Sequence, residues 1–302
     1  PHADKYMPDL KEWELYVSRV VRRYHRQVTY WQIWNEPNIP TFFRPQPDVG
    51  DYTQLLKTAY RAVKKQDKDA QVLMAGLSGI DSGYMQALYD AGAGEYFDII
   101  ALHPYRASFR MSPEVGGFLS DMKRVEELSS MFGDKPVWFT EFGWPTDSTE
   151  GVSEIDQAKY LTRTYLMSLS LPRVEKIFWY DLRDDGDNQA YREHNFGLMK
   201  RDYTTKPSYR AYKNLITLLR YSTIDHIASS GENGIYDFWF TSGTRKVRVL
   251  WRLQGESQIV VDSVSRAQVY TMLGDMRVLS SRGTAQEILS DSPLFIVYDN
   301  AS

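Results

Sequence analysis

Two glutamates stand at equivalent places in the sequence, each at the end of a short apolar run. Glu36 lies in "WQIWNEPN" and Glu141 lies in "VWFTEFGW". We interpret both runs as buried β-strands, because each is short, apolar and followed by a turn containing Pro or Gly. A carboxylate in such a place is costly to keep ionised unless polar groups surround it. Two such carboxylates indicate a chemical task rather than a pair of surface ion pairs.

The separation of the two glutamates fits one active site. They lie 105 residues apart (141 − 36) with two further expected strands between them, which gives 35 residues (105/3) for each strand–helix step. An eight-stranded (β/α) barrel uses roughly 31 residues a step and carries its chemistry at the carboxyl ends of the strands. Three steps bring the two strand ends to opposite sides of one mouth. Two carboxyl groups across a cleft are the groups that glycoside hydrolysis requires.

The rest of the first two thirds of the chain alternates apolar strands with amphipathic helices. This alternation predicts βα units around a parallel sheet that is buried on both faces. Asp9 and Glu12 form a capping-box pattern at the start of the first helix. The expected strands are 28–34, 70–76, 96–105, 135–144 and 174–182, and the expected helices are 8–25, 51–67, 82–92, 118–133, 153–171 and 206–220.

After about residue 221 the pattern changes to short, partly alternating runs. Six of them predict a small antiparallel sheet or sandwich: 234–240, 246–253, 257–263, 266–273, 276–281 and 294–299. We therefore expect a (β/α) domain over residues 1–221 and an all-β domain over 222–302 that supports it structurally.

Composition narrows the function classes. The chain has 302 residues, 42% of them hydrophobic and 25% charged, as in ordinary soluble globular proteins. Its net charge of −3 argues against nucleic acid or an anionic membrane as the partner. No run of about 18 apolar residues predicts a transmembrane helix. No signal-peptide pattern is visible, and the localisation stays open. The absence of cysteine excludes disulfides, zinc–thiolate sites and thiol catalysis.

The motif "WNEPN", with "TEFGW" about a hundred residues later, resembles the retaining glycosidases of clan A. The closest likeness is to glycoside hydrolase family 39 and its bacterial relatives. The segments "DIIALHPY", "KIFWYDL" and "TTKPSYRAY" support it, and the resemblance covers roughly Tyr6 to Tyr221. It implies hydrolysis of a β-glycosidic bond with retention of configuration, on a small glycoside, an oligosaccharide or a polysaccharide. Neither the sugar nor endo or exo action follows from the sequence.

The resemblance also implies roles for individual residues. Glu36 would be the acid/base, Glu141 the nucleophile, and Asn35 the residue that hydrogen-bonds the sugar 2-hydroxyl. His103 and Tyr105 would line the cleft, with Tyr105 orienting Glu141, although His103 is as readily explained as a hydrogen-bonded core histidine.

Two tryptophans complete the expected substrate site. Trp179 would form the platform under the reacting sugar, and Trp144 would contact substrate unless it only packs a crowded loop. The chemistry requires no cofactor and no metal. We expect the acidic loop "DLRDDGDN" (181–188) to be solvated, because Arg183 stands where a calcium loop needs its second oxygen ligand.

Glu36 comes early for a residue that ends the fourth strand of a barrel. Three preceding strand–helix units need more than about 90 residues, so we expect an incomplete (β/α)8 barrel of about five units, strands four to eight. Three explanations are open: a piece of a full barrel, a short form that covers its open side as a homo-oligomer, or a poorly active fragment that retains sugar binding. We favour the homo-oligomer. The alternative function is a catalytically weak or inactive carbohydrate-binding or scaffold protein.

Overall fold

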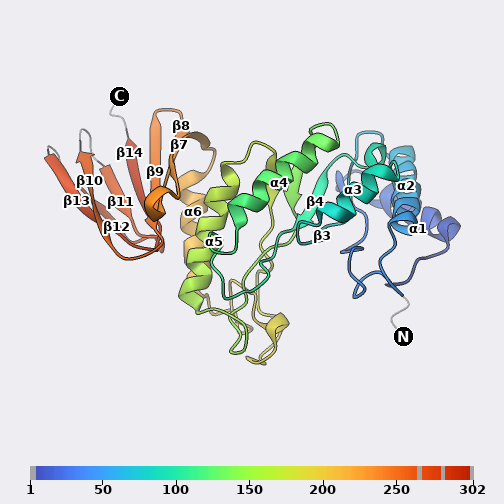
Figure 1. Ribbon diagram of the computed structural model, residues 1–302, viewed down its shortest axis with the longest axis horizontal. Helices are drawn as coiled ribbons and strands as arrows, with labels where there is room; N and C mark the ends of the chain where they lie inside the picture. Colours follow the sequence, from blue (N-terminus) through green and yellow to red (C-terminus); the bar gives the residue numbers. More distant parts are fainter. Residues whose placement is uncertain (1–4, 264–266, 280–282, 300–302) are drawn as a thin grey trace. The chain divides into compact units, whose positions relative to one another are not determined.

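The computed structural model describes residues 5–263, 267–279 and 283–299 (Figure 1). Contacts within the chain divide it into two compact units. The first unit contains the residues up to Ala107, Gly116–Phe142 and Leu171–Trp179. The second contains Ser108–Val115, Gly143–Ser170 and the chain from Tyr180 onward. The chain therefore passes back and forth between the units rather than finishing one before starting the other.

A parallel sheet forms the centre of the first unit. Its strands are β1 (Tyr30–Gln32), β2 (Gln71–Leu73), β3 (Leu77–Ser78), β4 (Ile100–His103), β5 (Val137–Phe139) and β6 (Val174–Ile177). β2 pairs with β1 and β3 pairs with β4, while single bridges Asn35–Gly76 and Leu73–Ile99 continue both ladders across the break. β2 and β3 are thus two pieces of one strand, and five parallel strands follow one another in sequence order.

Helices α1 (Leu10–Tyr24), α2 (Val49–Gln66), α3 (Ser82–Asp90) and α4 (Phe118–Met131) belong to the same unit. The side chain of Asp9 accepts hydrogen bonds from the backbone N–H groups of Lys11 and Glu12, so it caps α1 as the sequence predicts. Gly92 and Gly133 lie two residues after the last residues of α3 and α4, and their φ values of 65° and 78° suit glycine. These caps fix where each strand–helix unit begins and ends.

The sheet of the first unit curls strongly. Trp138 on β5 and Lys176 on β6 are cross-strand neighbours, and the Lys176 ammonium lies 4.0 Å from the Trp138 ring centre. Tyr30 stands on β1, three strands away, yet its ring centre is 4.6 Å from that of Trp138. Such a contact across the sheet requires that the sheet be strongly curved. The inner face carries a buried cluster of Leu73, Ile99, Ala101 and Trp138.

The second unit contains α5 (Glu154–Leu169), α6 (Pro207–Leu219) and an antiparallel β-rich part. Its six-stranded sheet has the order β12 (Met276–Val278), β11 (Ala267–Tyr270), β14 (Leu294–Asp299), β9 (Arg245–Arg252), β8 (Ile235–Ser242) and β7 (Thr223–Ser230). A separate two-stranded antiparallel sheet, β10 (Ser257–Ser263) and β13 (Gly283–Leu289), packs on it through Val261 and Leu289, which share a core with Leu250 and Ile296. Figure 1 shows these strands side by side near the C-terminus.

The expected α/β fold with a parallel sheet and a C-terminal antiparallel part is confirmed. The sequence pattern does not predict β7 and β13. β7 is a mostly exposed edge strand without alternation, so it lacks the usual apolar signal. Of the expected strand residues, Arg266, Ser280 and Ser281 lie outside the described ones.

The domain boundary expected at residue 221 stays a prediction. The contacts group α5, α6 and their flanking loops with the β-rich part. Within the described ranges, no helix is long and apolar enough to cross a lipid bilayer.

Candidate active site

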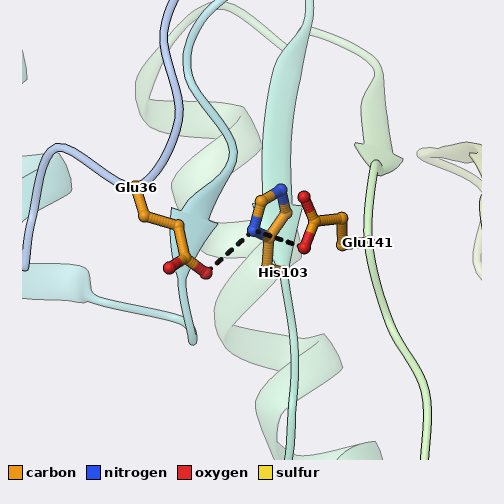
Figure 2. A group of neighbouring side chains, drawn as sticks. All are labelled: Glu36, His103 and Glu141. Atoms are coloured by element: carbon orange, nitrogen blue, oxygen red, sulfur yellow. Dashed lines mark hydrogen bonds and ion pairs between the residues drawn. The ribbon is translucent and has the colours of Figure 1, made fainter. Parts of the chain in front are cut away.

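Three ionisable side chains meet at the C-terminal edge of the parallel sheet: Glu36, His103 and Glu141 (Figure 2). Glu36 follows β1, His103 ends β4, and Glu141 lies two residues beyond β5. Nδ1 of His103 is 2.9 Å from Oε1 of Glu36 and 3.6 Å from Oε2 of Glu141. One imidazole nitrogen of His103 and one carboxylate oxygen of each glutamate all lie within 4.8 Å of one another. The sequence-predicted carboxyl pair is therefore brought together around one imidazole.

The imidazole of His103 is held in one orientation. The side chain is fully buried, and its second nitrogen, Nε2, lies 3.1 Å from the hydroxyl oxygen of Thr140. The ring also packs against the backbone of Gly76, where an added Cβ would come within 2.0 Å of Nε2. Only glycine leaves room for the ring at that position. Both nitrogens and the ring plane are therefore fixed by neighbours.

Glu36 stands on an unusual backbone. Its φ is +41° and that of Trp34 is +79°, in the left-handed region that non-glycine residues seldom adopt. Asn38 ties this loop to β3, because its side chain donates to the carbonyl of Ser78 at 3.0 Å and accepts from the N–H of Ser78 at 2.9 Å. Such strained residues persist where surrounding contacts hold them. Here the strained loop directs the Glu36 carboxyl toward His103.

Glu141 is more accessible than Glu36. Its side chain is 34% exposed, compared with 10% for Glu36. The hydroxyl of Tyr105 donates a long hydrogen bond of 3.4 Å to Oε2 of Glu141. The two carboxyl groups thus face the same imidazole from different environments, one nearly dry and one open to solvent.

Two cavities are lined by residues that hydrogen-bond the cluster. One, of about 310 Å³, is lined by Thr140 together with the aromatic rings of Tyr30, Trp138 and Phe178. The other, also open to solvent and about 410 Å³, is lined by Tyr105 and by polar groups that include Arg106 and Asp121. Thr140 hydrogen-bonds His103 and Tyr105 hydrogen-bonds Glu141, so each cavity shares one lining residue with the surroundings of the cluster.

The remaining predicted site residues occupy different places. Asn35 is half-buried and pairs through its backbone with Gly76 beside the cluster. Trp179 is half-buried in the first unit with its ring edge-on to Phe142, 5.2 Å between centres. Trp144 belongs to the second unit, is buried, and donates from Nε1 to the carbonyl of Met111 at 3.0 Å. The substrate roles of Asn35, Trp144 and Trp179 stay predictions.

Three residues at the site escape the sequence reasoning: Asn38, Gly76 and Thr140. Asn38 ends the "WNEPN" motif, and its polar side chain in a turn is a usable signal. Thr140 stands two residues after Trp138, so strand alternation continued one residue past the end of β5 points both side chains the same way. No local sequence signal marks Gly76, because glycine is required there only by the ring of His103, which is far away in the sequence.

The acidic loop after β6 is only partly solvated, contrary to expectation. Asp185 and Asp187 are exposed, whereas Asp184 is buried and accepts from the ammonium of Lys206 at 2.8 Å. Burial raises the pKa of Asp181 to about 7, and the neighbouring carboxylates Asp185 and Asp184 add to the rise. Asp184 is buried because the Lys206 ammonium, which is itself only 1% exposed, needs a buried counter-ion.

Known proteins share the fold and about a quarter of the aligned residues. A family model described as a glycosyl hydrolase catalytic core matches residues 8–212. The chain is 26% identical over 226 residues to a β-xylosidase of Caldicellulosiruptor saccharolyticus, covering 68% of this chain and 46% of that protein. The structure is similar to a family 39 glycoside hydrolase from Bacteroides cellulosilyticus WH2, with a TM-score of 0.80, 27% identity, and coverage of 96% of this chain and 62% of the other.

The fold alone is shared with a monomeric β-xylosidase from Caulobacter crescentus CB15, at a TM-score of 0.68 and 17% identity, covering 99% of this chain and 76% of that one. The chain spans about half the length of the curated relative and less than two thirds of the Bacteroides structure.

Proposed function

Because the chain belongs to the family of glycosyl hydrolase catalytic cores, we propose that it is a glycosidase that cleaves a β-glycosidic bond with retention of configuration. The resemblance to family 39 is consistent with this activity, and so is the name of the β-xylosidase to which the chain is similar. The substrate we propose is accordingly a β-xyloside or a related small glycoside, oligosaccharide or polysaccharide.

One observation carries the proposal: carboxylate oxygens of Glu36 and Glu141 lie within 4.8 Å of each other. Retaining glycosidases hold their two carboxyl groups about 5–5.5 Å apart, whereas inverting enzymes need about 6.5–9.5 Å to admit a water molecule. The short spacing supports direct attack by one carboxylate on the sugar.

Each glutamate has one role in each of two steps. In the first, the Glu36 carboxyl donates its proton to the glycosidic oxygen as the C–O bond breaks, and the Glu141 carboxylate forms an ester with the anomeric carbon. In the second, Glu36, now ionised, takes a proton from water, whose oxygen attacks that carbon and releases Glu141. Asn35 would bind the sugar 2-hydroxyl, and Tyr105 would orient the Glu141 carboxylate.

A second candidate is a carbohydrate-binding or scaffold protein with little catalysis. What favours it is that the described residues supply five parallel strands, whereas a closed barrel of this kind has eight. We propose that the sheet is such an incomplete barrel and that a second copy of the chain covers its open side. Both carboxyl groups are in place, which favours the enzyme over the scaffold.

A panel of aryl β-glycosides tests the proposal. We expect the unmodified protein to release nitrophenol from at least one sugar, and proton NMR to show the β-anomer of the free sugar first. Inverted product would reject retention, and no turnover on any sugar would favour the scaffold.

Variants at the two glutamates test their roles. Glu141→Ala should abolish turnover, whereas Glu36→Ala should spare substrates with good leaving groups, which need little protonation. If both variants kept the unmodified rate on a poor leaving group, the assigned roles would be wrong.

A further inference from the structure

Glu36, His103 and Glu141 also offer the ligand atoms that a metal ion uses. We propose that Glu36, His103 and Glu141 bind a single transition-metal ion of the Zn²⁺ type. The three residues offer one imidazole nitrogen and two carboxylate oxygens, the ligand types that Zn²⁺ takes in proteins. This use of the site is separate from glycoside cleavage, for which no metal is required.

Two of the three separations between the ligand atoms already suit one ion. Zinc–nitrogen and zinc–oxygen bonds are about 2.0–2.2 Å long, so two ligand atoms on one tetrahedral ion lie roughly 3.3 Å apart. The two measured separations from Nδ1 of His103, 2.9 Å to Glu36 and 3.6 Å to Glu141, bracket that value. The carboxylate oxygens of Glu36 and Glu141 lie within 4.8 Å of each other, so they must also approach by up to about 1.5 Å, a movement shared between the two side chains.

The surroundings of the imidazole already match those of a zinc-bound histidine. A metal-ligating histidine almost always uses its other ring nitrogen to hydrogen-bond a second group, which fixes the tautomer and the ring plane. In this chain Nε2 of His103 lies 3.1 Å from the Thr140 hydroxyl, and Gly76 confines the ring. Nδ1 is therefore the nitrogen turned toward the two carboxylates (Figure 2).

The site has room for an incoming ion and for its remaining ligands. The Glu141 side chain is 34% exposed, so an ion reaches the cluster from solvent, whereas His103 is fully buried. Three protein ligands leave the fourth tetrahedral position to water. Two carboxylates and a neutral imidazole also balance the charge of a divalent ion, which lowers the cost of placing it at a half-buried site.

The ligand set predicts which ions bind. An imidazole nitrogen selects Zn²⁺, Ni²⁺ and Cu²⁺, whereas Mg²⁺ and Ca²⁺ prefer oxygen ligands alone. Where the glycosidase function proposed above holds, the bound ion would occupy the lone pairs of both catalytic carboxyl groups. Micromolar Zn²⁺ would then stop turnover, and a chelator would restore it.

Isothermal titration calorimetry with ZnCl2, in the absence of sugar, tests the inference. We expect one saturable site in the metal-stripped protein and none for MgCl2 at the same concentration. His103→Gln and Glu141→Gln should each weaken Zn²⁺ binding at least about 100-fold, and Thr140→Val about 10- to 100-fold. Glu141→Gln keeps the size of a solvent-exposed side chain, so it reports on binding even where His103→Gln unfolds.

His226→Gln is the matched control, because His226 is exposed on β7 with Nδ1 2.8 Å from a carboxylate oxygen of Asp225. Its Zn²⁺ affinity should equal that of the unmodified protein. No saturable Zn²⁺ binding, equal binding of Mg²⁺, or unchanged affinity in Glu141→Gln would each overturn the inference. A protein that binds Zn²⁺ through the cluster but cleaves no glycoside would reject the proposed function alone. An active enzyme without the Zn²⁺ site would reject the inference alone.

Discussion

At the scale of single residues, the position of His103 organises the site. Its Nδ1 faces both carboxyl groups, while its Nε2 contacts the Thr140 hydroxyl and lies against the backbone of Gly76. Any change that tilts the ring moves a polar partner away from Glu36 and Glu141 at the same time. The residues that hold the ring therefore matter for the chemistry although they need not touch substrate.

Gly76→Ala should damage the site through the ring. The added methyl would lie 2.0 Å from Nε2, so the imidazole or the strand must shift. We expect a loss of about 1–3 kcal/mol in the free energy of unfolding, as for other overpacked cores, and a fall in kcat on an aryl glycoside. Chemical denaturation and steady-state kinetics measure the two effects.

Gly83→Ala is the control for Gly76→Ala. Gly83 lies in the first turn of α3, where an added Cβ would be 3.5 Å from Asp81, an ordinary contact. Alanine should leave stability equal or raise it by up to about 1 kcal/mol. Equal stability and equal kcat for Gly76→Ala and the unmodified protein would contradict the described packing.

Asp181 gives a pH dependence of stability. Its pKa in the folded protein is about 7, raised from 3.8 by burial and by Asp185 and Asp184. An acid with a raised folded pKa stabilises the fold at low pH, and this contribution is lost as the pH rises from about 4 through 7. Asp181→Asn should therefore raise the melting temperature at pH 8 and change it least near pH 4, as thermal unfolding at both pH values would show. An equal shift at the two values would contradict the raised pKa.

At the scale of secondary-structure elements, the loop Ser108–Val115 after β4 is anchored in the second unit. Oε1 of Glu114 accepts from the indole N–H of Trp251 on β9 at 3.0 Å and lies 3.3 Å from the guanidinium of Arg163 on α5. The side chains of Glu114 and Arg163 are 2% and 3% exposed. One buried carboxylate therefore joins a loop, a helix and a strand.

Glu114→Gln should destabilise the second unit strongly. It leaves the Arg163 charge buried without its counter-ion, which costs about 3–5 kcal/mol. The urea midpoint of unfolding, followed by tryptophan fluorescence, measures the change. Glu150→Gln is the matched control, because Glu150 pairs with Arg192 at the surface, where side chains are 64% and 43% exposed, and should change stability by less than about 1 kcal/mol. Similar losses in both variants would contradict the buried role of Glu114.

The sequence predicts elements and site residues to different degrees. The five parallel strands and the convergence of Glu36 and Glu141 follow from apolar runs and strand-end positions, which are local signals, whereas the place of His103 in the cleft is implied only by the family resemblance. β7 does not follow, because an exposed edge strand needs no apolar face. Gly76 and the Glu114 anchor do not follow either, since each is defined by a partner far away in the chain, His103 or Trp251.

At the scale of the whole molecule, the outer strands of the parallel sheet remain unpaired on one side among the described strands. Tyr30 on β1 is 43% exposed, and Phe178, just beyond β6, is 47% exposed. Exposed aromatic side chains next to free strand edges favour association. The proposed second copy of the chain would cover them.

The mass in solution tests this association. We expect light scattering after size exclusion to give a multiple of the 35.1 kDa chain. Phe178→Ser should shift the distribution toward single chains, while Tyr191→Ser, at an equally exposed aromatic residue of the second unit (51%), should not. A single chain at all concentrations would reject the homo-oligomer.

The interlaced path of the chain limits how such a protein can diverge. Ser108–Val115 belongs to the same unit as α5 and β9. Recombination therefore cannot exchange the chain from Tyr180 onward without affecting the contacts of this earlier loop. A transplanted segment lacking a donor at position 251 would remove one of the two partners of the buried Glu114 carboxylate and leave Arg163 as the other. Related proteins in which this segment has been replaced should therefore show correlated changes at positions 114, 163 and 251. An alignment of related sequences would reveal such changes.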